Sequence, residues 1–259
     1  MAKETKRPAD QAAMQSYDWS QSGITGFEHT QDTDLGIPFL AILQDGSPQI
    51  KKSDPNYALK KIEGAGPGDI VNSIANVVVH KQGGAPIQFV PCTHERLYVE
   101  WKPRESGGGM VKVHKNAAIT LECVRDERGR DVLKGGNIIM TTSYFYGLLL
   151  DEAGERKPVV IGMTSTQLKK ARQWLNMMTA LKMTSASGQK FTPPMFSHIY
   201  ALSTVAEANA EGSWFGWQIR MSGPLTDQEL IKKALETAKS SFTGRAVLPP
   251  PSSETESHM

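Results

Sequence analysis

The sequence predicts an α+β fold built on a mainly antiparallel β-sheet with two helices. Strand-like runs outnumber helical ones, the two types do not alternate as they do in a doubly wound sheet, and turn-forming residues separate successive strands. The chain of 259 residues has 23 glycines and 15 prolines, which indicates many turns, and it is long enough to bury a sizeable core.

The two ends of the chain differ in composition from the segment between them. Residues 1–34 are polar and lack hydrophobic periodicity, and residues 245–259 follow a proline run and are polar and acidic. We therefore expect a disordered N-terminal arm (1–34), one α+β domain (35–244) and a disordered C-terminal tail (245–259). The domain carries 25 basic and 19 acidic side chains, a positive balance that favours an anionic partner.

Strands dominate the domain. An apolar run after residue 35 ends in the turn-forming segment Asp45–Pro48, and the glycine-rich segments 83–86 and 107–109 separate later runs. The expected strands are Ile70–His80, Ile87–Trp101, Asn137–Leu150, Pro158–Met163, Phe196–Val205 and Trp214–Ser222.

Two segments have the periodicity of a helix. Between Thr164 and Met183, apolar side chains recur at helical spacing on one side, and polar side chains occupy the other. Thr164 and Gln167 have the spacing of a capping box, in which each side chain bonds the other's backbone N–H. The second helix is expected from Thr226 to Phe242, again with a threonine and a glutamate at capping-box spacing.

The composition argues against secreted and membrane proteins. No stretch approaches the roughly 18 uninterrupted apolar residues that a membrane-spanning helix needs, and the charged start lacks the apolar region of a secretory signal. The two cysteines, Cys92 and Cys123, are too few for a disulfide framework. We expect a cytoplasmic protein with no membrane partner.

The most specific feature is a gap in the distribution of acidic residues. Residues 156–206 contain seven basic side chains and no Asp or Glu. A solvated surface normally mixes both signs, whereas a phosphate backbone favours an unbalanced positive field because bound cations release its counterions. The alternative is a chance run on an ordinary surface.

Aromatic side chains lie near these charges in the sequence. In a strand, Tyr144 and Tyr146 share one face, so one face of the sheet can fill the core while the other offers rings for bases to stack on. The alternative is that all of these rings belong to the core. Lys51 and Lys52 precede a loop that could clamp a nucleic-acid backbone, or they are solubilising charges.

Together these features predict a nucleic-acid-binding surface. Its candidate residues are Lys51, Lys52, Arg96, Trp101, Lys102, Arg104, Tyr144, Tyr146, Arg156, Lys157, Lys169, Lys170, Arg172, Lys182, Lys190, Trp214, Trp217 and Arg220. We expect a groove between the acid-free segment and the strand that bears Arg96, Trp101 and Lys102.

Catalytic and cofactor motifs are absent from the sequence. It has no phosphate-binding loop, no nucleophile elbow and no paired carboxylates typical of a nuclease metal site. Cys92, His94, His114 and Cys123 could supply four zinc ligands, but their spacing matches no common zinc motif. We therefore expect a protein that is not an enzyme and has no cofactor or metal.

Three blocks of sequence resemble a bacteriophage family: IPFLAILQDGSPQIKK, PVVIGMTSTQLKKARQWLNMM and PPMFSHIYALSTVAEANAEGSWFGWQI. The resemblance covers residues 35–225 and is to the single-stranded-DNA-binding proteins of lytic podoviruses, closest to the Drc type, which are cofactors of a phage-encoded RNA polymerase. It implies binding to single-stranded DNA, self-association along the strand, assistance to phage transcription or replication, and a fold that need not be an OB barrel.

The residues and the resemblance thus favour a sequence-tolerant single-stranded-DNA-binding protein. Two other hypotheses remain open at this point. One is an interaction protein that docks on the polymerase and has only incidental affinity for DNA. The other is a phage enzyme, such as a nuclease, whose site the sequence does not reveal.

Overall fold

The computed structural model describes residues 28–29, 36–150, 156–210 and 212–240. Most of the expected arm (1–34) and all of the expected tail (245–259) lie outside these residues. The chain divides into two compact units, residues 1–36 and 37–259, and the second unit holds all the elements that follow.

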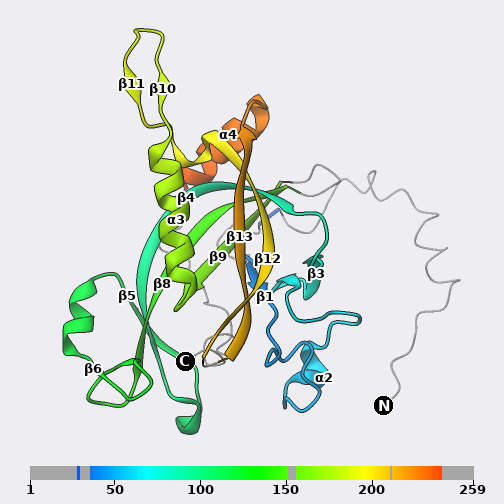
Figure 1. The fold of residues 1–259 in the computed structure, drawn as a ribbon, viewed down its shortest axis with the longest axis vertical. Coiled ribbons are helices and arrows are strands. Elements are labelled where there is room, and N and C mark those ends of the chain that lie inside the picture. Colours follow the sequence, from blue (N-terminus) through cyan, green and yellow to red (C-terminus); the bar gives the residue numbers. More distant parts are fainter. Residues whose placement is uncertain (1–27, 30–35, 151–155, 211, 241–259) are drawn as a thin grey trace, which may run out of the picture. The chain divides into compact units, whose positions relative to one another are not determined.

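The second unit consists mostly of strands (Figure 1). The strands are β1 (Phe39–Ile42), β2 (Ile70–Asn72), β3 (Val77–His80), β4 (Ile87–Trp101), β5 (Met110–His114), β6 (Val124–Arg125), β7 (Asp131–Val132), β8 (Ile138–Leu150), β9 (Arg156–Thr164), β10 (Met183–Thr184), β11 (Lys190–Phe191), β12 (His198–Asn209) and β13 (Gly212–Pro224). The helices are α2 (Tyr57–Lys60), α3 (Gln167–Ala180) and α4 (Gln228–Lys239), with 3-10 turns η3 (Arg104–Ser106), η4 (Ala117–Glu122) and η5 (Met195–Ser197).

Eleven of the strands form one sheet, in the order β13-β12-β4-β8-β9-β1-β2-β3, with β5 paired to β4 and β7 joining β6 to β8. Within the described chain, every pairing is antiparallel except that of β1 with β9. The main path ends in two edge strands, β13 and β3, so the sheet is not a closed barrel. The predicted α+β class with a mainly antiparallel sheet and two main helices is confirmed.

The central strand β8 is covered on both of its faces. Phe145 and Leu149 belong to the cluster that α3 covers, whereas Tyr144 and Tyr146 pack into a second cluster on the other face with Leu97. A third cluster lies under α4. Because successive residues of a strand point to opposite sides, burial on both faces requires the nearly continuous apolar run that β8 has.

Trp174 of α3 is the centre of the largest cluster. Its ring stacks on Phe145 with a centroid distance of 4.4 Å and lies 5.8 Å from Phe89 and 5.5 Å from Tyr200. Ala171 and Met178, one helical turn to either side, are buried with it. The helical spacing seen in the sequence therefore marks the buried face of α3.

Two glutamine side chains cover the edge strand β13. Gln44, which follows β1, bonds the backbone of Phe215 in both directions, with distances of 2.8 and 2.9 Å. The Gln167 side-chain oxygen accepts a 3.0 Å bond from the backbone N–H of Trp217. These bonds occupy backbone groups that an unpaired edge would expose.

The predicted caps of both helices are wrong by one or two positions. Thr164 belongs to β9, where it pairs with Thr142, so α3 begins after Thr166, and Gln167 serves β13 instead of a capping box. At α4, the Asp227 carboxylate accepts from two backbone N–H groups and takes the place predicted for Thr226.

The predicted strand Ile70–His80 is divided into β2 and β3. The side chain of Asn72 accepts bonds from the backbone N–H groups of Ile74 and Ala75, and Asn76 has a left-handed φ of 52°. Asparagine favours such turns because its side chain bonds nearby backbone. None of the helices in the described part of the chain has the length and apolar character that crossing a membrane requires.

Candidate nucleic-acid interface

Four exposed cations follow one another along α3 and the hairpin β10–β11. Lys169 and Arg172 lie on the exposed side of α3, Lys182 follows the helix, and Lys190 lies in β11. The hairpin continues from the end of α3 (Figure 1). Among the described residues, no carboxylate forms an ion pair with any of these four cations. We call Lys169, Arg172, Lys182 and Lys190 the basic ridge.

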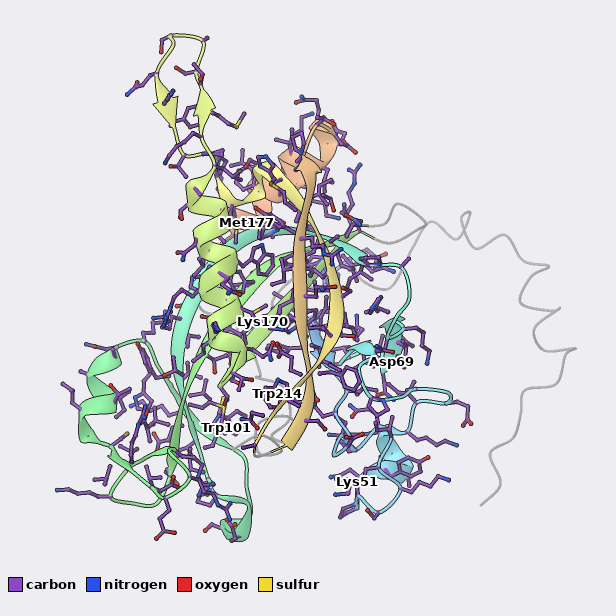
Figure 2. All side chains as sticks on the ribbon, viewed as in Figure 1. Lys51, Asp69, Trp101, Lys170, Met177 and Trp214 are labelled. Atoms are coloured by element: carbon purple, nitrogen blue, oxygen red, sulfur yellow. The ribbon has the colours of Figure 1, made fainter. Side chains whose placement is uncertain are left out.

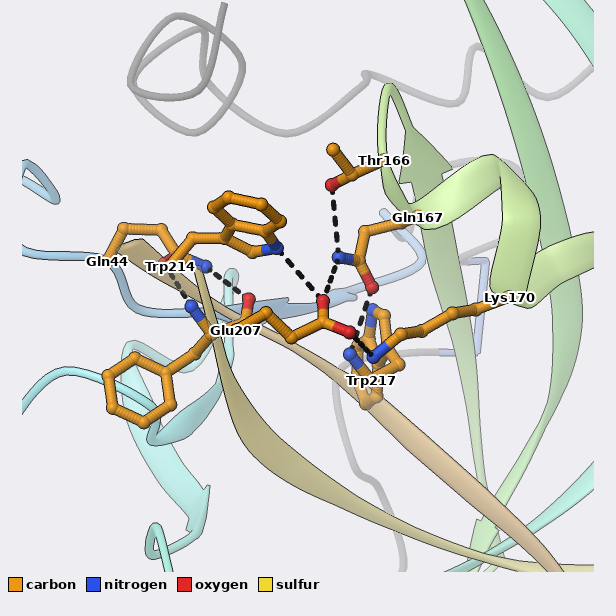
Figure 3. Close-up of polar contacts among 8 residues, drawn as sticks. Gln44, Thr166, Gln167, Lys170, Glu207, Trp214 and Trp217 are labelled. Atoms are coloured by element: carbon orange, nitrogen blue, oxygen red, sulfur yellow. Dashed lines mark hydrogen bonds and ion pairs between the residues drawn. The ribbon is translucent and has the colours of Figure 1, made fainter. Parts of the chain in front are cut away.

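Lys170 points away from the ridge and forms an ion pair. Its Nζ lies 2.7 Å from Oε1 of Glu207, and Oε2 of the same carboxylate accepts bonds from Trp214 Nε1 at 2.9 Å and from Gln167 at 3.4 Å (Figure 3). Partial burial raises the pKa of Glu207, but the hydrogen bonds and the charge of Lys170 outweigh it, so the pKa lies below its ordinary value. Lys170 therefore ties α3 to the β12–β13 hairpin.

Arg96 is an exposed cation on the sheet face that α3 covers. Arg96 lies two residues after His94 in β4, so the two side chains share a face of the strand. The ring of His94 is 4.8 Å from the ring of Phe145, which stacks on Trp174 of α3. Burial, and then the charge of Arg96, lower the pKa of His94, which is therefore neutral at pH 7. Arg96 therefore lies on the same face of the sheet as α3, and its role in binding stays a prediction.

Trp101 and Lys102 do not complete the expected groove. Trp101 is an odd number of residues from Arg96, so it lies on the opposite face of β4, where it packs against the cluster of Tyr144 and Tyr146. Lys102 is exposed beyond the end of the strand. The side chain of Arg104 lies outside the described part of the structure.

Three of the predicted stacking rings are buried. Tyr144, Tyr146 and Trp217 are 2%, 1% and 3% exposed, so bases cannot reach them in this fold. Burial raises the pKa of Tyr144 to about 12, so its hydroxyl stays protonated. The stacking role predicted for these rings is wrong because helices and neighbouring strands cover both faces of the sheet. Trp214 is half-buried and bonded to Glu207.

The remaining predicted cations lie apart from the ridge or are paired. Lys51 and Lys52 are exposed on the segment between β1 and β2, and Figure 2 shows Lys51 away from α3. Arg156 bonds Asp227 at 2.5 Å, beside the start of α4, and Lys157 is exposed next to it. Arg220 is exposed on β13.

An exposed aromatic side chain of the acid-free segment, next to the ridge, is not among the predicted site residues. Phe191 in β11 is 43% exposed and pairs across the hairpin with Met183, which is 46% exposed. Lys182 and Lys190 adjoin this pair in the sequence. The signal available in the sequence was the turn-forming Ser187-Gly188 between two short runs that each join a lysine to an apolar residue.

The family model for Pam3 phage gp34-like proteins matches residues 3–247 of the chain. The chain belongs to this bacteriophage family. The match includes every described element, and the basic ridge and the hairpin lie within it. No curated protein and no solved structure matches the chain.

In this member of the Pam3 phage gp34-like family, the four candidate zinc ligands have other partners. His114 Nε2 lies 2.8 Å from Glu100, and the buried Cys92 thiol points to the carbonyl of Val90. His94 is 3.3 Å from the hydroxyl of Ser143, and the Cys123 thiol lies 3.5 Å from the carbonyl oxygen of Ile119. Across the described residues, no three His, Cys, Asp or Glu side chains are grouped so that they could hold a metal ion.

Proposed function

We propose that this phage protein binds single-stranded DNA without sequence preference and performs no reaction on it. The observation that carries the proposal is the basic ridge, which places four exposed cations on a segment without a carboxylate. Cations of this kind displace the counterions condensed on a phosphate backbone, which provides affinity independent of sequence.

The exposed pair Met183 and Phe191 favours single strands over duplex. An unpaired base offers its flat face to a ring, whereas a base within a duplex is already stacked on its neighbours. Phe191 lies next to Lys190 in β11, so one strand can place phosphates on the ridge and a base on the ring.

The proposed biological role is to hold unpaired template during phage transcription or replication. The bacteriophage family supports the phage context. The link to a phage RNA polymerase, and the self-association along the strand that forms part of this proposal, rest on the resemblance to Drc-type cofactors. Sedimentation of the protein with and without DNA tests the self-association.

Fluorescence anisotropy with labelled oligo-dT, and competition by single- and double-stranded oligonucleotides of one sequence, test the proposal directly. We expect the single strand to compete at a lower concentration than the duplex. Equal competition, or no binding at low salt, contradicts the proposal. Labelled DNA incubated with the protein and Mg²⁺ or Mn²⁺ should stay intact, and cleavage would show that the protein is an enzyme.

A second proposed function is docking on the polymerase through an apolar surface. The segment from β5 to β6 exposes Leu121 by 87%, Val124 by 69% and Val111 by 44%. Exposed apolar side chains gathered on one segment favour a protein partner. A pull-down of the polymerase after nuclease treatment tests this function, and the Leu121→Ala protein should retain less polymerase than wild type does.

A further inference from the structure

An apolar cavity lies at the base of the β10–β11 hairpin. It has a volume of about 380 Å³, near the lower end of the range for small-molecule sites. Its walls are formed by the hairpin, η5, the end of β13 and α4. Its main lining side chains are Leu181, Met183, Phe191, Phe196, His198 and Leu225.

The hairpin is held in a defined shape above this cavity. Lys182 Nζ donates a 2.6 Å bond to the hydroxyl of Thr192, which joins the two strands at their base. At the tip, Ser185 and Gln189 bond each other through backbone and side chain, and Gly188 has a φ of 82°. These bonds fix the positions of Met183 and Phe191 at the cavity before any ligand arrives.

Two strands alone cannot bury the apolar side chains of this hairpin. Met183 and Phe191 remain almost half exposed although they pair with each other. A two-stranded hairpin is marginally stable in water, and a ligand that covers this pair removes apolar surface from solvent.

The charges around the cavity indicate which ligand covers it. Lys182 lines the cavity, whereas Lys190 precedes Phe191 on the opposite face of β11. Two carboxylates near the start of α4 are already paired, Asp227 with Arg156 and Glu229 with Lys232. A ligand that is apolar against Phe191 and anionic at Lys182 matches this lining.

We infer that this cavity binds one unpaired nucleobase of the DNA strand, stacked on Phe191, with the adjoining phosphate at Lys182. His198 and Ser197, whose side chains bond each other at 2.8 Å, also line the cavity and supply polar groups for the edge of the base. The inference rests on the proposed single-strand binding and adds the site that distinguishes a base from a bare phosphate chain.

Replacing the ring tests the site. The Phe191→Ala protein should bind oligo-dT about 5- to 100-fold more weakly than wild type, the loss expected for one stacked base. Its affinity for an abasic oligodeoxyribose phosphate of the same length should be unchanged, because that ligand has phosphates but no bases. Leu59→Ala removes an apolar side chain that is 86% exposed on α2 and should change neither affinity.

The two ligands separate failure of the site from failure of the proposed function. If Phe191→Ala binds oligo-dT as wild type does, while Lys169→Gln with Arg172→Gln weakens binding, the base site is refuted and single-strand binding stands. If Phe191→Ala weakens binding of oligo-dT and of the abasic chain equally, the base site is also refuted. If wild type binds neither ligand at low salt, the proposed function fails.

A gain-of-signal variant avoids dependence on lost affinity. Phe191→Trp places an indole at the cavity. The fluorescence of this indole is obtained by subtracting the spectrum of wild type from that of the variant. It should be quenched by oligo-dT and unchanged by the abasic chain. Quenching or a blue shift with vesicles of phosphatidylglycerol, without a response to oligo-dT, would show that the cavity takes a lipid and would overturn the inference.

Discussion

At the scale of single residues, Trp174 shows how closely the fold and the helix depend on each other. The indole is 1% exposed between Phe89, Phe145 and Tyr200, yet its Nε1 has no hydrogen-bond partner within the described structure. Its contribution is therefore its apolar bulk, since a buried N–H without a partner costs free energy.

Substitutions at Trp174 should separate the stabilisation by its apolar bulk from the cost of its unpaired N–H. Trp174→Ala should lower the free energy of unfolding by about 3–5 kcal/mol, because it leaves a cavity. Trp174→Phe should cost only about 1 kcal/mol, because it keeps a ring and removes the unpaired N–H. Urea unfolding measures both, and equal losses for the two variants would show that the indole N–H has a partner.

Asp69 should make stability depend on pH. Its carboxylate is nearly buried, pairs with Lys81 at 2.8 Å and accepts bonds from the backbone N–H groups of Gln82 and Gly66. Burial raises the pKa, but these bonds and the charge of Lys81 outweigh it, so the pKa lies below its ordinary value. The stabilisation is complete above the unfolded pKa of about 3.9 and is lost as the pH falls through the lower folded value.

Asp69→Asn should therefore destabilise the protein by about 1–3 kcal/mol at pH 7, and the difference from wild type should shrink as the pH falls below about 4. Urea unfolding across this pH range measures the difference. A constant difference would show that the charge of Asp69 does not contribute. Lys81→Gln should weaken the same pH dependence.

At the scale of elements, the bulge in β4 depends on a glycine in β8. The register between the two strands shifts between Pro91 and Thr93, opposite Gly147. A Cβ on Gly147 would lie 2.2 Å from the backbone oxygen of Val90 and 2.5 Å from the ring of Phe89. A backbone oxygen in a central strand cannot move aside, so the close approach of β4 and β8 requires glycine here.

Gly147→Ala should lower the free energy of unfolding by about 1–3 kcal/mol, the usual cost of overpacking. Gly135→Ala is the matched control, because no atom lies within 4 Å of its added Cβ, and it should change stability by less than about 0.5 kcal/mol. Thermal or urea unfolding compares the two variants, and similar effects would contradict the close packing at Gly147.

The sequence predicted elements better than it predicted their ends. Periodicity placed the strand Ile87–Trp101 and the helix within Thr164–Met183, because each pattern reflects which side chains are buried. The caps were misplaced because Thr164 pairs within a sheet and Gln167 bonds a strand that follows 50 residues later. Contacts of that range leave no local signal.

The candidate site was predicted only in part, because some of its features depend on contacts between distant segments. The acid-free segment is local, so the sequence located the ridge. The exposure of the aromatic rings depends on which segments cover β8. Two clusters that include distant segments bury Tyr144 and Phe145 on opposite faces of this strand. Phe191 is exposed because its hairpin leaves the sheet, which composition does not reveal.

At the scale of the whole molecule, the sheet and its four apolar clusters serve as a scaffold, and α3 leads into the β10–β11 hairpin (Figure 1), with Lys169 and Arg172 exposed. Lys170 and Arg156 hold elements together through Glu207 and Asp227, whereas no carboxylate among the described residues forms an ion pair with a cation of the basic ridge. This division between paired and exposed cations is the basis for assigning DNA binding to the ridge.

The dependence of oligo-dT affinity on salt tests this assignment most directly. If four ridge cations contact phosphates, the logarithm of the association constant should fall with the logarithm of salt concentration with a slope of about −3. Lys169→Gln with Arg172→Gln should reduce the slope to about −1.5, and Lys51→Gln with Lys52→Gln, which changes two exposed lysines away from α3, should leave it unchanged. A slope near zero in wild type, or equal effects of the two double variants, would contradict binding at the ridge.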